Sequence, residues 1–297
     1  MKPERLGLLA LLVVTVVWGT TFPAMKLLSA HLGALQIICL RFVIALAVLA
    51  PLWWGMRRPE RLWGCGLGLL LFLAFWLQIE GLARTSSNRN AFVTGLNVLV
   101  VPLMAMALLG RRYGWRLWAA CAMALAGMAL MFHENEPWNL GDTLTLTSTV
   151  FYALYILALE ECARRNAAQP LRATRMAAAQ ATVMALAATV LLLAHSGNMD
   201  WLRAAADLPA DALLALLYLG LLASVVVVSL QAWGQQRVDA MRSAIVFGLE
   251  PVFAALTAWA LLGERLGWAG LAGATLIVAA LVFSQIAPAR RRLPARA

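Results

Sequence analysis

The chain is built from ten long apolar runs separated by short polar turns. A helix needs about 20 mostly apolar residues to cross a membrane. The runs lie at roughly 6–28, 34–54, 62–83, 91–110, 114–132, 141–160, 174–195, 212–234, 242–262 and 267–286. Only 13% of the 297 residues are charged, against about 25% in soluble domains. We therefore predict an all-α integral membrane protein with ten transmembrane helices.

The first run follows Lys2 and Arg5, which is also how a signal peptide begins. No small-x-small cleavage pattern follows this run, however, and it carries Trp18, Pro23 and Lys26. We interpret it as the first transmembrane helix.

The basic residues are unevenly divided between the two sets of turns. With the N-terminus inside, 18 of the 24 Lys and Arg residues fall in cytoplasmic segments and 4 fall outside. This bias follows the positive-inside rule and predicts that both termini are cytoplasmic. The net charge is +10. Because the basic residues lie at the membrane surface, we expect them to bind anionic membrane lipids and not nucleic acid.

The sequence has no pattern of a catalytic or metal-binding site. The four cysteines form no CxxC pair, the three histidines form no HExxH, and neither a phosphate-binding glycine loop nor GxSxG occurs. We predict no cofactor, no metal and no catalytic residues. The alternative is a membrane-embedded enzyme acting on lipid-linked substrates, which would need titratable groups clustered at one depth.

The sequence repeats itself after 153 residues. RNAFVTGLNVLVVPLMAMALLGRRYGW at 89–115 aligns with RSAIVFGLEPVFAALTAWALLGERLGW at 242–268, and QxxGxxR recurs at 78–84 and 231–237. Five helices separate the copies, so the copies cross the membrane in opposite directions. We predict two inverted five-helix repeats, residues 1–132 and 133–297, an arrangement common in secondary transporters. Duplication without a transport role is the other interpretation.

Four motifs have a familiar pattern: WGTTF at 18–22 with Lys26, Arg41-Phe42, TGLNVLVVPL at 94–103, and GLEPVFAALTAWALLGERL at 248–266. They resemble the EamA-type transporters of the drug/metabolite transporter superfamily, and the likeness covers essentially the whole chain. It implies a secondary transporter of small organic metabolites in a bacterial inner membrane. Such proteins often export amino acids or related amphipathic compounds by alternating access. The superfamily's small multidrug members couple protons through a glutamate in helix 1, which the run 6–28 lacks.

Four charged residues inside or beside the spans are candidates for gating or coupling. Glu250 is an ionisable group within an apolar run, followed directly by Pro251. It either couples or gates transport, or it locks a proline kink without touching substrate. Arg41 must pair or reach toward water, and Lys26 lies closer to the surface. An ion pair between Glu80 and one of these two cations would form a lock on the outer side.

The predicted substrate site is polar and aromatic. Its members are repeat-related polar residues and aromatic residues that share a helix face. They are Trp18, Phe22, Gln78, Asn97, Ser148, Tyr152, Tyr155 and Gln231. Faces of small residues on the fifth and tenth runs, such as Gly127 and Gly273, form either a rigid frame or the interface of a homodimer.

Overall fold

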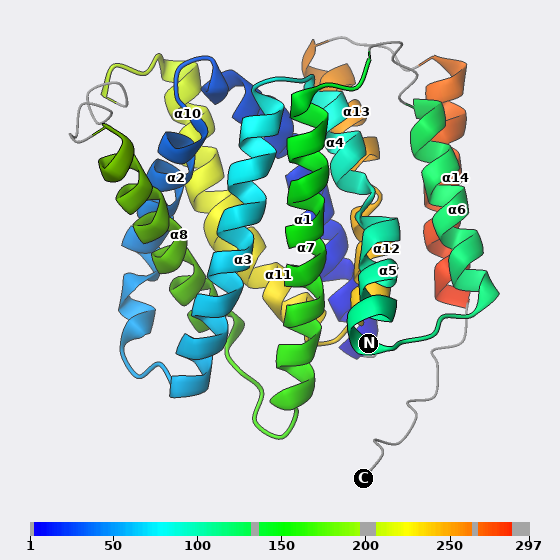
Figure 1. Cartoon of the computed structure of the whole chain (residues 1–297), viewed down its shortest axis with the longest axis horizontal. Coiled ribbons are helices and arrows are strands. Elements are labelled where there is room, and N and C mark those ends of the chain that lie inside the picture. The colour runs from blue at the N-terminus through cyan, green and yellow to red at the C-terminus, as the bar shows by residue number, and fades with distance from the viewer. Residues whose placement is uncertain (1–2, 132–136, 197–205, 263–266, 287–297) are drawn as a thin grey trace.

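The structure is a computed structural model that describes residues 3–131, 137–196, 206–262 and 267–286. The described residues form helices and no strand (Figure 1). Eight segments are long and apolar enough to cross a membrane, and the two shorter apolar helices Trp115–Leu130 and Trp268–Ser284 complete the predicted ten. The basic C-terminal tail and the repeat match of Arg112 with Arg265 involve residues outside the described ranges.

The first half of the chain contains α1 to α6. Their bounds are α1 Pro3–Ser29, α2 Ala34–Leu49 with the 3-10 turn η1 Ala50–Trp53, α3 Arg58–Leu82, α4 Ser87–Gly95, α5 Asn97–Leu109 and α6 Trp115–Met131. The predicted fourth span is therefore two half-helices, α4 and α5. They meet at Leu96, whose backbone amide still donates to the carbonyl of Val93.

The second half follows the same order. Its elements are α7 Leu140–Arg165, α8 Ala173–Ser196, α10 Ala210–Tyr218, the π-helix η2 Leu219–Val227, α11 Val228–Gln235, α12 Ala240–Phe247, α13 Glu250–Leu262 and α14 Trp268–Ile286. The ninth span is also broken, between α12 and α13, at Leu249. Leu249 lies 153 residues after Leu96, so the two breaks occupy equivalent positions in the repeat.

The two broken helices run in opposite directions. In Figure 1 the chain passes from α4 at the top to α5 at the bottom, and from α12 at the bottom to α13 at the top. α4 packs against α13, and α5 packs against α12. A Cβ placed on Gly95 would lie 3.3 Å from the ring of Pro251, so the two breaks meet near the centre of the protein. The predicted inverted repeat is thus visible in the fold.

Small residues bring the helices of the frame together. α6 packs along α14, where a Cβ on Gly127 would lie 2.6 Å from the carbonyl oxygen of Gly273. α3 approaches α8 in the same way, with Gly64 against Ala179. The small faces predicted on the fifth and tenth spans therefore pack on each other within one chain. A homodimer stays a prediction and would need another surface.

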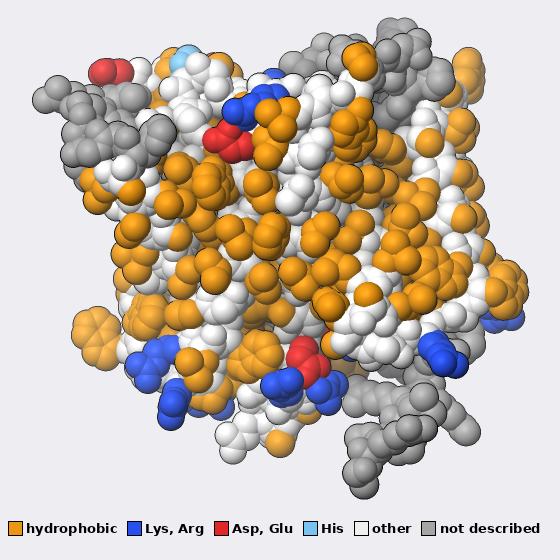
Figure 2. Space-filling model, in the orientation of Figure 1, with side chains coloured by type: hydrophobic (Ala, Val, Ile, Leu, Met, Phe, Trp, Pro, Cys, Tyr) orange, Lys and Arg blue, Asp and Glu red, His pale blue; other side chains and the backbone are white. Residues whose placement is uncertain are grey.

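The surface has the distribution expected of a protein in lipid. Exposed leucine and valine side chains cover its middle, and Lys and Arg gather mostly at the lower edge in Figure 2. Trp54, Trp115 and Trp268 are 86%, 71% and 88% exposed near helix ends, where an interfacial aromatic belt is expected. We call the lower edge in Figure 2, which holds the start of α1 and most of the Lys and Arg side chains, the basic face, and the other edge the opposite face.

Candidate functional site

A small cavity lies at the centre of the bundle, beside the two helix breaks. Its walls come from α1, α2, α3, α7 and both broken helices. The lining residues are Trp18, Thr21, Phe22, Met25, Arg41, Phe75, Gln78, Thr94, Asn97, Tyr152, Ile156, Phe247 and Glu250. The cavity volume is about 20 Å³, which is room for about one or two water molecules. The structure therefore shows a nearly closed state that must widen to admit an organic molecule.

Arg41 is 1% exposed on α2 and has no carboxylate partner among the described residues. Its Nε donates to the hydroxyl of Ser224 at 2.9 Å. Its guanidinium carbon lies 4.8 Å from the ring centre of Phe75, a cation–π contact. The prediction that Arg41 would pair or reach toward water is wrong, because a hydroxyl and aromatic faces satisfy part of the group. A buried cation without an ion partner is costly. An anion in the cavity that bound the remaining N–H donors of Arg41 would reduce this cost.

The π-helix η2 positions the hydroxyl that holds Arg41. A π-helix closes its hydrogen bonds five residues apart, and the hydroxyl of Ser224 donates to the carbonyl of Leu219 at 2.8 Å. Gly220 lets η2 approach α2, since a Cβ there would lie 2.7 Å from the side chain of Ile44. Such segments are frequent at functional sites.

Glu250 is 6% exposed and lines the same cavity. Among the described residues, no group donates a hydrogen bond or ion pair to its carboxyl group. The predicted proline kink is not present. The helix has already ended at Phe247, and Pro251 lies in the first turn of α13, where a missing N–H costs little. The first turn of a helix also favours an acidic side chain, so the start of α13 is a suitable place for Glu250 beside the cavity.

A chain of hydrogen bonds fixes the polar wall of the cavity. The hydroxyl of Tyr152 donates to Oε1 of Gln78 at 2.8 Å, and Nε2 of Gln78 donates to the hydroxyl of Thr94 at 3.0 Å. Nearby, Oδ1 of Asn97 is buried without a partner. Because an unpartnered buried acceptor is unfavourable, Asn97 is suited to accept a hydrogen bond from a bound molecule.

The apolar wall is aromatic. Trp18 packs against Phe247 with ring centres 5.2 Å apart and against Tyr152 at 6.5 Å. Tyr152 in turn contacts Phe75 edge-on at 5.9 Å. The cavity thus combines a cation, a carboxylate, two amides and a set of aromatic faces.

Seven of the residues singled out from the sequence line this cavity. They are Trp18, Phe22, Arg41, Gln78, Asn97, Tyr152 and Glu250.

Three predicted substrate contacts point elsewhere. The hydroxyl of Ser148 donates to the carbonyl of Thr145 within its own helix, and the hydroxyl of Tyr155 donates to Gln180 on α8. Gln231 donates to Gln235 on the next turn of α11. These side chains are buried between helices, so the structure does not place them in the cavity wall.

The predicted outer lock is also absent from the described residues. Glu80 pairs at 2.5 Å with Arg84, which lies in the turn just after α3, and neither Lys26 nor Arg41 contacts it. Nζ of Lys26 instead donates to the carbonyls of Leu82 and Thr85, both at 2.8 Å. Those carbonyls lie at the C-terminal end of α3, where a cation is favourable.

Several cavity residues were not predicted. Thr94 lies in the TGLN motif three residues before Asn97, so the repeat could have indicated it. Phe75 lies three residues before Gln78 on the same face of α3, which was also a usable signal. Ser224 carried no signal, because its orientation depends on the π-helix.

Comparison with known proteins identifies the family. A model of the EamA-like transporter family matches residues 5–133 and again residues 139–285. The chain belongs to the EamA-like transporter family. As a member of this family, the protein is a membrane transporter of small molecules.

Two known proteins resemble this EamA transporter over most of its length. One, from Archaeoglobus fulgidus, is described as an uncharacterized transporter; it is 24% identical over 274 residues, which are 92% of this chain and 84% of that protein. The other is a solved crystal structure with a TM-score of 0.71 and 20% identity, covering 94% of this chain and 98% of the other. The second likeness supports the fold alone.

Proposed function

We propose that this EamA transporter exports amino acids or related amphipathic compounds across a bacterial inner membrane by alternating access. The basic face and both termini would lie in the cytoplasm, as the positive-inside rule predicts. The observation that carries the proposal is that one basic residue, Arg41, and one acidic residue, Glu250, line the same cavity and have no ion partner among the described residues.

A zwitterion matches this pair of charges. A guanidinium binds a carboxylate through parallel N–H···O bonds, so Arg41 would hold the carboxylate of an amino acid. Glu250 would accept hydrogen bonds from its ammonium group. Two buried charges that are costly alone would then be neutralised by one ligand. Gln78 and Asn97 add hydrogen-bonding groups, and Trp18 with its aromatic neighbours would pack against an apolar side chain.

The broken helices support alternating access around this cavity. In secondary transporters with inverted repeats, the substrate site lies near the membrane midplane beside discontinuous helices. Here the breaks at Leu96 and Leu249 flank the cavity. Movement of the half-helices would open the cavity toward one face and then toward the other. The arginines of the basic face would bind anionic lipid headgroups.

Transport by purified protein in liposomes tests the proposal. We would measure uptake of a labelled neutral amino acid with a large apolar side chain, in competition with two unlabelled analogues. The methyl ester keeps only the ammonium group and the N-acetyl derivative keeps only the carboxylate. We expect the zwitterion to compete at least about tenfold better than either analogue, because each loses one charged contact worth about 1.5–3 kcal/mol.

Matched variants assign the two contacts. Arg41→Gln should remove the preference for a free carboxylate, and Glu250→Gln should remove the preference for a free ammonium group. Arg84→Gln removes an arginine outside the cavity and should change neither preference. Equal competition by the ester and the zwitterion in the unmodified protein would contradict the proposal. An unchanged Glu250→Gln would assign that residue to stabilising the start of α13.

A further inference from the structure

A buried ion pair lies on the side of the cavity that faces the opposite face. Nε and Nη2 of Arg89, on α4, donate to the two carboxylate oxygens of Asp142, on α7, both at 2.7 Å. The side chain of Arg89 is 11% exposed and that of Asp142 is fully buried. Bidentate pairs of this kind fix geometry as well as charge. The pair therefore ties the first half of a broken helix to its neighbour.

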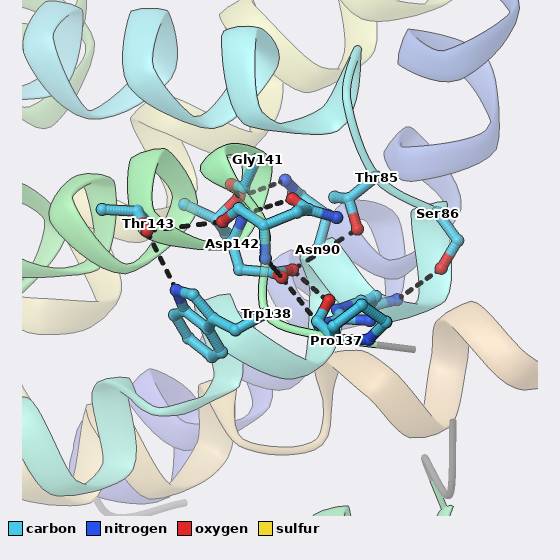
Figure 3. A network of polar contacts seen from close by, with 11 residues as sticks. Thr85, Ser86, Asn90, Pro137, Trp138, Gly141, Asp142 and Thr143 are labelled. Carbon is cyan, nitrogen blue, oxygen red and sulfur yellow. Dashed lines mark hydrogen bonds and ion pairs between the residues drawn. The ribbon is translucent and has the colours of Figure 1, made fainter. Parts of the chain in front are cut away.

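Other groups hold the Asp142 side of this pair in place (Figure 3). Oδ2 of Asp142 accepts from the backbone amide of Asn139, and Oδ1 of Asn139 accepts from the amide of Asp142, which forms a capping box at the start of α7. The hydroxyl of Thr85 donates to the same carboxylate at 3.4 Å. The carbonyl of Thr85 binds Lys26, so α1 and the end of α3 join the same network.

Polar groups continue from this pair to the cavity. Nδ2 of Asn90 donates to the hydroxyl of Thr145 at 2.7 Å and to the backbone carbonyl of Gln78 at 3.2 Å. Gln78 lines the cavity, while Oδ1 of Asn90 is buried without a partner. Polar side chains thus run along the seam between α3, α4 and α7 from the ion pair to the cavity. We call Arg89, Asp142, Thr85, Asn90 and Thr145 the polar seal.

The inverted repeat places a counterpart at the basic face. Arg242 is equivalent to Arg89 and lies in the first turn of α12, where it pairs with Glu4 at the start of α1. Its Nε also lies 3.6 Å from Asp239. Each broken helix therefore carries one arginine at its first half, and each arginine binds the beginning of a long neighbouring helix.

We propose that Arg89 and Asp142 form the gate between the cavity and the opposite face, with Arg242 and Glu4 as its counterpart at the basic face. Breaking the Arg89–Asp142 pair frees α4 from α7 and opens the polar seam to water. The inference rests on the proposed alternating access, and it does not depend on the substrate being an amino acid.

Accessibility of a single cysteine tests the gate. Thr21→Cys places a thiol in the cavity wall, in a background without Cys39, Cys65, Cys121 and Cys162. Vesicles of both orientations are treated with a membrane-impermeant thiol reagent, so that labelling from each face is measured separately. The charge-removing variants Arg89→Gln and Asp142→Asn should each raise the labelling rate from the opposite face by about tenfold, as the open state becomes more populated.

Controls separate the gate from general damage. Arg84→Gln breaks the ion pair with Glu80, which joins the last turn of α3 to the turn after it at the same face, and should leave labelling unchanged. The double variant Arg89→Gln, Asp142→Asn should be labelled no faster than either single variant, because both substitutions break the same ion pair. Glu4→Gln should raise labelling only from the basic face.

Several results would overturn the inference. Unchanged labelling in a folded Arg89→Gln protein would do so, as would an equal increase with Arg84→Gln or an increase from the basic face. If Arg89→Gln does not fold, Asp142→Asn provides the same test, because asparagine keeps an acceptor oxygen for the capping box. The readout involves no transported molecule. A gate that fails this test would leave amino acid transport untouched, and failure of the transport assay would leave the gate standing.

Discussion

Toward the opposite face the packing beside the cavity includes a buried ion pair and amide hydrogen bonds, whereas toward the basic face it consists mainly of aliphatic and aromatic side chains. The second closure, the apolar seal, lies between α1, α5, α7, α12 and the turn that precedes α12. Its buried members include Leu11, Val14, Val101, Ala105, Ile156, Val238, Ala244 and Phe247. The ion pair at that face is peripheral, since the side chain of Glu4 is 49% exposed.

The two closures differ in what opening costs. When the polar seal opens, Arg89 and Asp142 lose each other but regain hydration, and the two effects largely offset. When the apolar seal opens, its surface meets water at about 25 cal/mol per Å² with no compensating bond. We therefore expect the opposite face to open at the lower free-energy cost, while its bidentate geometry makes closure specific.

The largest predicted effect breaks the apolar seal. Leu11 is fully buried and its side chain lies against Gly234. Leu11→Ala should lower the free energy of unfolding by about 2–5 kcal/mol, as is usual for a truncated buried leucine. Thermal unfolding of the purified protein measures this, with the exposed Leu214→Ala as control. A loss no larger than that of the control would show that the apolar seal is not tightly packed.

The next prediction compares Gly81, which lies beside the polar seal, with Gly7, which lies beside the apolar seal. The atoms closest to a Cβ on Gly81 would be the hydroxyl of Thr145 and the backbone carbonyl oxygen of Gly141, the carbonyl at 2.7 Å. For Gly7 they are side-chain atoms of Arg237 and Val238, both at 2.8 Å, and the nearest backbone oxygen is 3.1 Å away. Backbone yields less than side chains, so Gly81→Ala should destabilise the protein by about 1–3 kcal/mol. Gly7→Ala should cost less in the same assay. The reverse order would mean that the polar side is the more adaptable one.

The smallest effect concerns the exposed ion pair. Glu4→Gln removes the partner of Arg242, and exposed pairs contribute about 0–1 kcal/mol. We expect a shift of the unfolding midpoint close to the error of the measurement, and a small increase in labelling from the basic face. An increase in labelling as large as that from Asp142→Asn would mean that the ion pairs at the two faces contribute equally to closure.

The sequence predicted the spans and the repeat because both depend on composition and register. It placed Gln78 and Tyr152 in the cavity wall but wrongly added Tyr155. Three residues advance a helix by about 300°, so the side chain of Tyr155 points about 60° away from that of Tyr152. Here this difference directs Tyr155 to α8. The sequence did not reveal the helix breaks. Glycines such as Gly95 and Gly248 are also common inside transmembrane helices that are continuous.

The prediction that Gln231 lines the cavity was wrong for a different reason. Gln231 mirrors Gln78 in sequence, but it follows the nine-residue π-helix η2, whereas α3 is regular. A π-helix has more residues per turn than an α-helix, so it changes the direction in which later side chains point. Repeat-related residues then face different neighbours. The sequence offers no local signal for such a segment, and the same is true of Ser224 and its contact with Arg41.

The breaks at Leu96 and Leu249 make α4 and α12 short levers. α4 has nine residues, so at 1.5 Å per residue it is about 13 Å long. A rotation of about 20° about Leu96 would carry the backbone of Arg89, seven residues from the break, through roughly 3.5–4 Å by this geometry. That displacement exceeds the 2.7 Å that separates the guanidinium from the carboxylate of Asp142. A modest swing of one arm is thus sufficient to part the ion pair, while α5 beyond the break stays packed against α7 and α12.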